Sequence, residues 1–263
     1  REPRFTWSAE ILPADEKHDL SAVLDQCRKL KDQGVDFFSI ADGPAGSPRG
    51  GTAELTDLLR KEFQTLAVPH LITRDRTAEK LSEFIEDYAK RGVRNILALR
   101  GDPPNDLAEG TEWNPREKGD YTFAYELIKQ IAQERPEISI GAACYPDRPN
   151  LEKEAAYLKS KQDAGARFAI TQLILSVDSY RAFVEAARKA DVTMPILPGV
   201  LVPHSEEHAQ QIAQRFGTRL DPKSIVGVNE TLADFAQKLK AAGAPGVHLY
   251  VLRSADVSIR TVR

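Results

Sequence analysis

Cysteine and methionine are scarce in this sequence, which has two cysteines and one methionine among 263 residues. Cys27 and Cys144 stand far apart, without the close spacing of metal-ligand or paired-thiol motifs. Cys27 falls in a helical pattern and Cys144 in a strand pattern, so we predict two buried, reduced thiols, which suit a cytosolic protein. The sequence also lacks an HExxH motif and a cysteine-rich metal set. We therefore expect no metal site.

An excess of positive charge is lacking as well. The net charge is −3 and the isoelectric point is about 6.0, with no polybasic run. We therefore expect no nucleic-acid partner and no attraction to an anionic membrane surface. No apolar run approaches the roughly 20 residues that span a bilayer, and there is no secretory signal. These absences predict a cytoplasmic protein that is not bound to a membrane.

What the sequence does contain is a regular alternation of short apolar runs and amphipathic segments. Each apolar run is continuous, which is typical of parallel strands that are covered on both faces. Eight such runs predict eight strands: 5–12, 37–42, 66–73, 95–102, 139–146, 168–175, 195–202 and 246–253.

Between these runs, 19–33, 77–91 and 150–164 have the spacing of amphipathic helices. Thr77 and Asn150 are predicted N-caps, and glycines such as the one in "DQGVD" are predicted C-terminal stops. Strict alternation in about 250 residues predicts a single-domain (β/α)8 TIM barrel over 1–263. A doubly wound open sheet is the alternative. Only about ten residues follow the last strand, so the last helix is expected to be short or truncated.

Catalytic residues of such barrels gather at the carboxyl ends of the strands. The predicted strand ends offer polar side chains at these positions: Glu10, Asp42, His70, Arg100, Asp102, Tyr145, Gln172, His204 and Arg253. Glu10 lies between Ala9 and Ile11, where a carboxylate is either paired with a cation or functional. Burial would raise its pKa and suit it to act as a general acid.

Three of these residues keep an ordinary structural interpretation open. His70 alone would be interpreted as a core histidine whose hydrogen bonds are satisfied. Arg100 and Asp102 could simply pair with each other at the barrel rim. The glycine-rich run 43–51 lacks phosphate-loop spacing and is interpreted first as a loop after the second strand.

Together the strand ends resemble one family, methylenetetrahydrofolate reductase. The resemblance covers nearly the whole chain and rests on "VPHLIT" (68–73), "ALRGDPP" (98–104), "DAGARFAITQ" (163–172), "ILPGVL" (196–201) and the glutamate of strand 1 followed by proline. It implies a flavin-containing (β/α)8 barrel that reduces 5,10-methylenetetrahydrofolate to 5-methyltetrahydrofolate in one-carbon metabolism and methionine biosynthesis. NADH or NADPH would reduce FAD, and folate would then replace the nicotinamide in a ping-pong sequence.

The resemblance also implies roles for individual residues. Glu10 matches the proposed general acid, Asp102 an aspartate near the flavin and folate, and Gln172 a glutamine that hydrogen-bonds the pterin. Arg253 is the nearest match to a basic substrate-binding residue. The positions that match or replace FAD contacts are Ala41, His70, Arg100, Gly101, Asp102, Ala124, Tyr145, Arg148 and Lys161.

The segment after Tyr145 departs from the family pattern, and Ile212 lies near the position of a shielding aromatic. Alternatives therefore stay open: a flavin-independent reductase, one fed with electrons by a partner subunit, or a non-catalytic flavin- or folate-binding barrel. A barrel lyase or aldolase would require a strand lysine or a metal cluster, and no predicted strand interior holds a lysine. The resemblance further implies a homo-oligomer.

Overall fold

A computed structural model of the protein describes residues 4–14, 19–42, 51–103 and 112–251. Its strands form one closed barrel in chain order, and every neighbouring pair is parallel. The predicted barrel is confirmed, and the open sheet is ruled out because β1 pairs with β8. The strands are β1 (Thr6–Ile11), β2 (Phe37–Ile40), β3 (Leu66–Ile72), β4 (Asn95–Leu99), β5 (Ser139–Cys144), β6 (Ala166–Leu173), β7 (Ile196–Val200) and β8 (Gly246–Tyr250).

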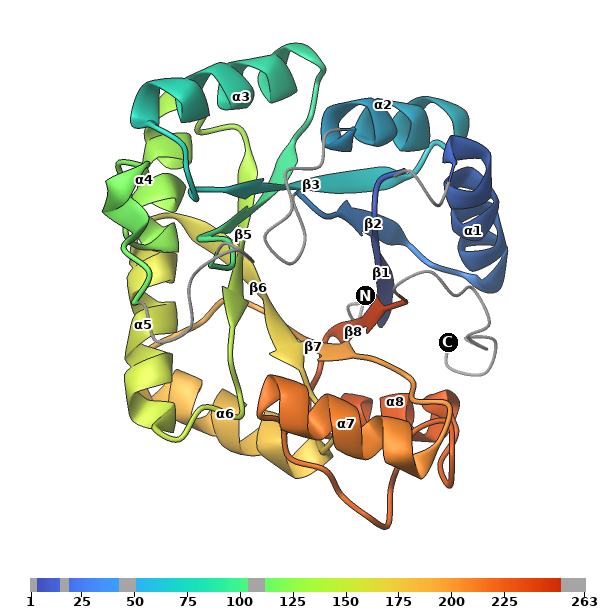
Figure 1. Ribbon diagram of the computed structural model, residues 1–263. Coiled ribbons are helices and arrows are strands. Elements are labelled where there is room, and N and C mark those ends of the chain that lie inside the picture. Colours follow the sequence, from blue (N-terminus) through green and yellow to red (C-terminus); the bar gives the residue numbers. More distant parts are fainter. Residues whose placement is uncertain (1–3, 15–18, 43–50, 104–111, 252–263) are drawn as a thin grey trace.

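Helices surround the strands in the order of the chain (Figure 1). Eight α-helices lie within the described residues: α1 (Leu20–Gln33), α2 (Thr52–Glu62), α3 (Ala78–Lys90), α4 (Ala124–Glu134), α5 (Leu151–Asp163), α6 (Val177–Lys189), α7 (Glu206–Phe216) and α8 (Leu232–Ala241). A short 3-10 helix, η2 (Pro115–Glu117), precedes α4. None of the described helices is both long enough and apolar enough to cross a bilayer.

The predicted helix ends are confirmed. The side chains of Thr77 and Asn150 accept hydrogen bonds from the backbone N–H groups of Lys80 and Lys153, which caps α3 and α5. Glycines with positive φ follow four of the helices, as the sequence predicts for turns into the next strand: Gly34, Gly92, Gly165 and Gly243.

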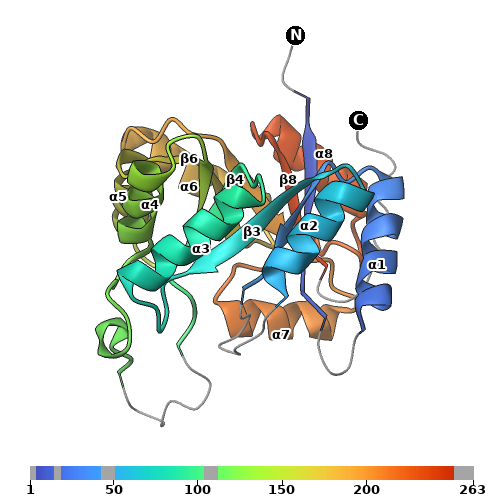
Figure 2. The same ribbon diagram turned by 90° about the horizontal axis from the view of Figure 1, so that it is seen from above.

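Two helices, α7 and α8, fill the long connection between β7 and β8. They lie at different positions along the barrel axis. Helix α8 lies beside the strands, and α7 lies at one end of the barrel (Figure 2). Ile212 of α7 packs with Leu173 and Tyr250, which places α7 over the ends of β6 and β8. The segment after β8, where a short or truncated last helix is expected, lies outside the described residues.

The barrel is covered on both faces, as continuous apolar strands require. Outward side chains of the strands join the helices in one large core, which includes both cysteines, so the prediction of buried thiols is confirmed. A smaller apolar layer fills part of the interior: Val68, Leu97, Ile170 and Leu197.

A buried polar group completes the barrel interior. The Nδ1 of His248 lies 2.8 Å from Ser8 Oγ, and its Nε2 lies 3.5 Å from Ser39 Oγ. Burial, with a smaller contribution from His70, lowers the pKa of His248 to about 3, so this imidazole is neutral at physiological pH. Each ring nitrogen of His248 therefore has a serine hydroxyl as its hydrogen-bond partner, and each hydroxyl can either donate or accept.

Candidate active site

Glu10 stands near the end of β1, level with Ser39 of β2 and Tyr250 of β8. Its side chain is 21% exposed, and its Oε2 lies 3.8 Å from His70 Nε2. Burial, and then the charge of Asp102, raises the pKa of Glu10 to about 7. The carboxyl group is therefore divided between its protonated and ionised forms near neutral pH, which is what a general acid requires.

His70, on β3, faces Glu10 as a neutral imidazole. Burial lowers its pKa to about 3, so the approach to Glu10 is not an ion pair. At 3.8 Å it is also too long for a hydrogen bond. The buried Nε2 atom has no hydrogen-bond partner within the described residues. The interpretation of His70 as a satisfied core histidine is therefore wrong, and a buried nitrogen without a partner is available to bind a ligand.

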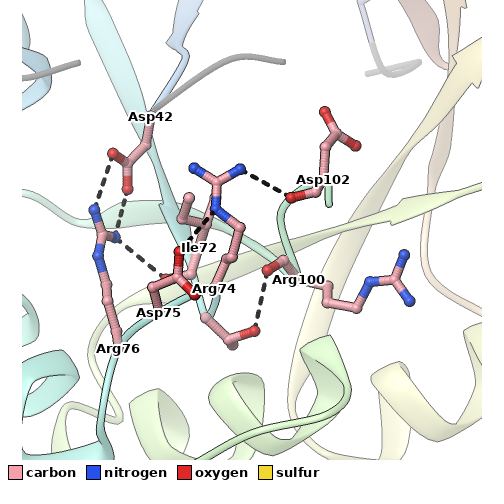
Figure 3. A network of polar contacts seen from close by, with 8 residues as sticks. Asp42, Ile72, Arg74, Asp75, Arg76, Arg100 and Asp102 are labelled. Atoms are coloured by element: carbon pink, nitrogen blue, oxygen red, sulfur yellow. Dashed lines mark hydrogen bonds and ion pairs between the residues drawn. The ribbon is translucent and has the colours of Figure 1, made fainter. Parts of the chain in front are cut away.

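The end of β4 is attached to the end of β3 through Arg74 (Figure 3). Arg74 Nη1 donates to the carbonyl oxygen of Asp102 at 2.8 Å, and Arg74 N donates to the carbonyl oxygen of Arg100 at 3.0 Å. Between them Gly101 has φ +88°, and a Cβ there would lie 3.1 Å from Arg74 Cβ. The turn therefore requires glycine. Sequence reasoning missed Arg74, although it is a buried arginine just beyond a strand end.

Arg100 and Asp102 do not pair with each other, so that interpretation is wrong. Their side chains point apart (Figure 3), and the Arg100 guanidinium lies 5.1 Å from the centre of the Trp113 ring. Both side chains are exposed. The carboxylate of Asp102 acts on Glu10 instead, because its negative charge raises the pKa of that group.

Replacing Asp102 by asparagine is expected to lower the pKa of Glu10, because the neutral amide no longer opposes ionisation of the glutamate. Burial, the larger cause, would still hold this pKa above its usual value. An NMR titration of side-chain ¹³C-labelled glutamates would measure the change. An unchanged pKa of Glu10 would mean that the Asp102 charge does not reach it.

Asp42 has a structural role at the end of β2. Its carboxylate receives two hydrogen bonds from Arg76, at 2.6 and 3.1 Å, which tie β2 to β3 (Figure 3). The neighbouring Ala41 is buried, and its carbonyl oxygen accepts a hydrogen bond from the Thr52 hydroxyl at 2.9 Å. These bonds therefore fix the backbone where the chain leaves β2. This point lies beside the barrel mouth, by which we mean the opening at the carboxyl ends of the strands.

A group of cations surrounds Tyr145 after β5. The Arg148 guanidinium lies 5.2 Å and the Lys161 ammonium 5.8 Å from the centre of its ring. Lys161 is 3% exposed and donates to the carbonyl oxygen of Ala143 at 2.7 Å. Burial lowers its pKa, against the opposing effect of Glu154. Arg100 contributes a third charge, since it influences the pKa of both Tyr145 and Lys161. We name Arg100, Arg148 and Lys161 the cationic patch.

Aromatic side chains border the cationic patch. Phe123 and Tyr125 stack at 5.4 Å, and Tyr157 meets both rings edge-on, at 5.6 and 6.2 Å. Ala124 lies between the stacked pair at the start of α4 and is buried. Tyr157 itself lies 5.1 Å from the Lys161 ammonium. Phe123, Tyr125 and Tyr157 therefore form an aromatic wall beside the patch, on the side of α4 and α5.

Gln172, near the end of β6, is half-buried. Its Oε1 accepts a hydrogen bond from the N–H of Leu173 at 2.9 Å, which identifies the oxygen and leaves the NH2 group as the donor. His204 lies beyond β7, with the centre of its ring 4.0 Å from that of His208 and the two planes tilted by 37°. Arg253 lies outside the described residues. Tyr250, beside Glu10, was missed from the sequence because a tyrosine in an apolar strand looks like core.

Comparison with known proteins points to one family. The family model described as methylenetetrahydrofolate reductase matches residues 1–262. Methylenetetrahydrofolate reductase 1 of Schizosaccharomyces pombe is 27% identical over 269 residues, which cover 95% of this chain and 44% of that protein. The 5,10-methylenetetrahydrofolate reductase of Pectobacterium carotovorum is 28% identical over 276 residues, which cover 97% and 88%. The chain thus spans less than half the length of the fission-yeast relative.

Solved structures share the barrel at low identity. A Clostridium thermocellum protein, described as uncharacterised and as binding two copies of 5-methyl-5,6,7,8-tetrahydrofolic acid, superposes with a TM-score of 0.63 at 12% identity, covering 98% of this chain and 94% of that one. A 2,3-dimethylmalate lyase superposes with a TM-score of 0.56 at 13% identity, covering 94% and 74%. These likenesses show the fold alone. The family match over the whole chain shows more: the chain belongs to the methylenetetrahydrofolate reductase family.

Proposed function

We propose that this protein reduces 5,10-methylenetetrahydrofolate to 5-methyltetrahydrofolate. The observation that carries the proposal is Glu10, a largely buried carboxyl group at the barrel mouth whose pKa is raised to about 7. Membership of the family supports the same reaction, as does a barrel of the same fold described as binding 5-methyltetrahydrofolic acid.

Glu10 would act as the general acid. Reduction of the methylene group requires the five-membered ring of the substrate to open, and the nitrogen that leaves the methylene carbon must gain a proton. Protonated Glu10 can deliver it, because its pKa of about 7 keeps a large fraction protonated at neutral pH. The iminium carbon left by ring opening then accepts a hydride and becomes the methyl group.

Asp102 and Gln172 would position the substrate around Glu10. The Gln172 amide has its NH2 group left to donate to an acceptor of the pterin, because its oxygen is bound to Leu173 N. The carboxylate of Asp102 would accept hydrogen bonds from the pterin and would also hold the pKa of Glu10 high. A basic group on the segment after β8, Arg253, is the further proposed substrate contact.

The described residues fit a flavin dinucleotide. The cationic patch suits a diphosphate, the aromatic wall suits a flat ring system, and the unpartnered Nε2 of His70 suits a polar edge of a ligand. When bound, FAD would supply the hydride that is taken from NADH or NADPH. The residues proposed to hold it are Ala41, His70, Arg100, Gly101, Asp102, Ala124, Tyr145, Arg148 and Lys161.

The visible absorption spectrum of the purified protein tests this proposal. A flavin spectrum that bleaches without oxygen on addition of NADH or NADPH is expected, followed by reoxidation on addition of 5,10-methylenetetrahydrofolate. A matched pair of variants would place the flavin. Lys161→Ala should weaken FAD binding about tenfold or more, because it removes a buried cation. Lys159→Ala, on the same helix and paired with Asp163, should have no effect.

Other outcomes would redirect the assignment. A flavin that neither nucleotide bleaches would indicate electrons from a partner subunit. A protein that FAD does not reconstitute but that reduces the folate would indicate direct transfer from the nicotinamide. Ligand binding without turnover in either direction would indicate a binding barrel and would refute the proposed reaction.

A further inference from the structure

Strand β6, which carries Gln172, has one more residue than β7 over the same stretch of pairing. Ile170 of β6 is level with Leu197 of β7, and Leu173 is level with Gly199. Three steps along β6 thus match two steps along β7. This is a β-bulge, and the extra residue falls at Thr171–Gln172.

Packing on the two sides of the bulge confirms that the bulge shifts the alternation of side chains between the two faces of β6. Ala169 and Ile174 both join the core between the strands and the helices, although they are five residues apart. In a regular strand, an odd separation places two side chains on opposite faces. Ile170, in contrast, lies in the inner layer of the barrel. The bulge therefore reverses the alternation just where Gln172 stands.

Backbone groups that the bulge removes from the regular ladder are bonded in other ways. The carbonyl oxygen of Thr171 accepts a hydrogen bond from the Tyr250 hydroxyl at 2.8 Å. The Thr171 hydroxyl oxygen accepts one from the N–H of Gly199 at 2.8 Å. The N–H of Leu173 donates to the side chain of Gln172 at 2.9 Å. Three strands, β6, β7 and β8, thus meet at one irregular point.

Gly199 makes room for this arrangement. A Cβ at Gly199 would lie closer than 3.0 Å to both Tyr250 Cε2 and the carbonyl oxygen of Thr171. The tyrosine ring also meets His248 edge-on at 5.2 Å. The ring is thus packed against both Gly199 and His248 while its hydroxyl bonds to the bulge.

We propose that Tyr250, Thr171 and Gly199 form a clamp that holds the bulge of β6 and thereby aims the amide of Gln172 into the barrel mouth. Tyr250 is then a positioning residue that acts through Gln172. The part of the inference that concerns substrate rests on the proposed function, in which the Gln172 amide donates to an acceptor of the pterin. The clamp itself is a property of the strands and can be measured without a ligand.

Hydrogen exchange of the Leu173 and Gly199 amides tests the clamp directly. Tyr250→Phe removes only the hydroxyl, so both amides should exchange about 3- to 10-fold faster, as expected for the loss of one hydrogen bond. Tyr180→Phe is the matched control, because the Tyr180 hydroxyl donates at 2.9 Å to the carbonyl oxygen of Ile196, a β7 residue outside the bulge. Equal exchange at Leu173 and Gly199 in the wild type and in Tyr250→Phe would overturn the clamp.

Binding of 5-methyltetrahydrofolate, measured by calorimetry, tests the link to Gln172. Tyr250→Phe and Gln172→Ala should each weaken binding about 3- to 10-fold, and the double variant should be no weaker than Gln172→Ala alone. Tyr180→Phe should bind as the wild type does. Additive losses would mean that Tyr250 acts independently of Gln172. A wild type that binds no folate would refute the proposed function, and the clamp would then be decided by the exchange rates.

The threonine hydroxyl offers a rescue experiment. Thr171→Val keeps the shape of the side chain but removes the acceptor for Gly199 N, so it should behave as Tyr250→Phe does. Thr171→Ser keeps the hydroxyl and should restore slow exchange and folate binding. A serine variant as impaired as the valine variant would contradict the role of this hydrogen bond.

Discussion

Replacing Glu10 by glutamine should slow the reduction of 5,10-methylenetetrahydrofolate by about 10²- to 10⁴-fold, the usual contribution of a positioned general acid. The amide has nearly the shape of the carboxyl group but no proton to give. Reduction of the flavin by NADH or NADPH requires no proton from this residue and should keep its rate. Stopped-flow measurement of the two half-reactions would separate these effects. A glutamine variant that binds folate and reduces it at the wild-type rate would refute the assignment of Glu10.

The pH dependence of folate reduction should follow from the ionisation of Glu10. The wild-type rate of folate reduction should fall as the pH rises through about 7, because Glu10 loses its proton there. The fold raises the pKa of this acid from 4.5 to about 7, so the folded state loses stability as the pH rises between these values, and the loss is complete above them. The glutamine variant should therefore be no less stable than the wild type at pH 8. A thermal unfolding curve would exclude unfolding as the reason for lost activity.

Replacing Gly246 by alanine should have the largest effect on stability. Gly246 begins β8 opposite Thr6 of β1, at the seam where the barrel closes. A Cβ there would lie closer than 3.0 Å to three atoms of Thr6, two of which belong to the backbone. The strands must separate to admit it. We expect a loss of about 3 kcal/mol, the upper part of the range for overpacking, measured as a lower midpoint in urea.

Gly243 supplies the control for this substitution. It lies in the same connection, has φ +86°, and a Cβ there would meet nothing within 4 Å. Gly243→Ala should therefore cost only the strain of a left-handed backbone, about 1 kcal/mol. A Gly246→Ala variant that is as stable as Gly243→Ala would show that the seam relaxes easily.

Much of the fold could be predicted from the sequence because its determinants are local. Apolar runs, caps such as Thr77 and Asn150, and glycine stops are each determined by a few neighbouring residues. The order of the strands then follows from short right-handed connections. The placement of α7 at the mouth could not be predicted, because its contacts, such as Ile212 with Leu173 and Tyr250, join distant parts of the chain.

The site was predicted less completely, because it too depends on contacts between distant parts of the chain. Glu10 and His70 could be identified because polar residues in apolar strands are unusual, and the structure brings them together. Arg100 and Asp102 are near in sequence but point apart, because Arg74, which follows the neighbouring strand β3, fixes the turn between them. The bulge at Thr171 could not be predicted from the residues around it. It depends on Tyr250, 79 residues further along the chain.

The hydrogen bond between Ser8 and His248 has a consequence for synthesis of the protein. These residues are 240 positions apart, and translation at about 5–20 residues per second separates their appearance by about 10 to 50 s. During that interval β1 has no β8 to pair with, and an unpaired strand edge invites association with other chains. The distance in sequence between β1 and β8 thus sets a minimum time during which the edge of β1 stays unpaired while the chain is made.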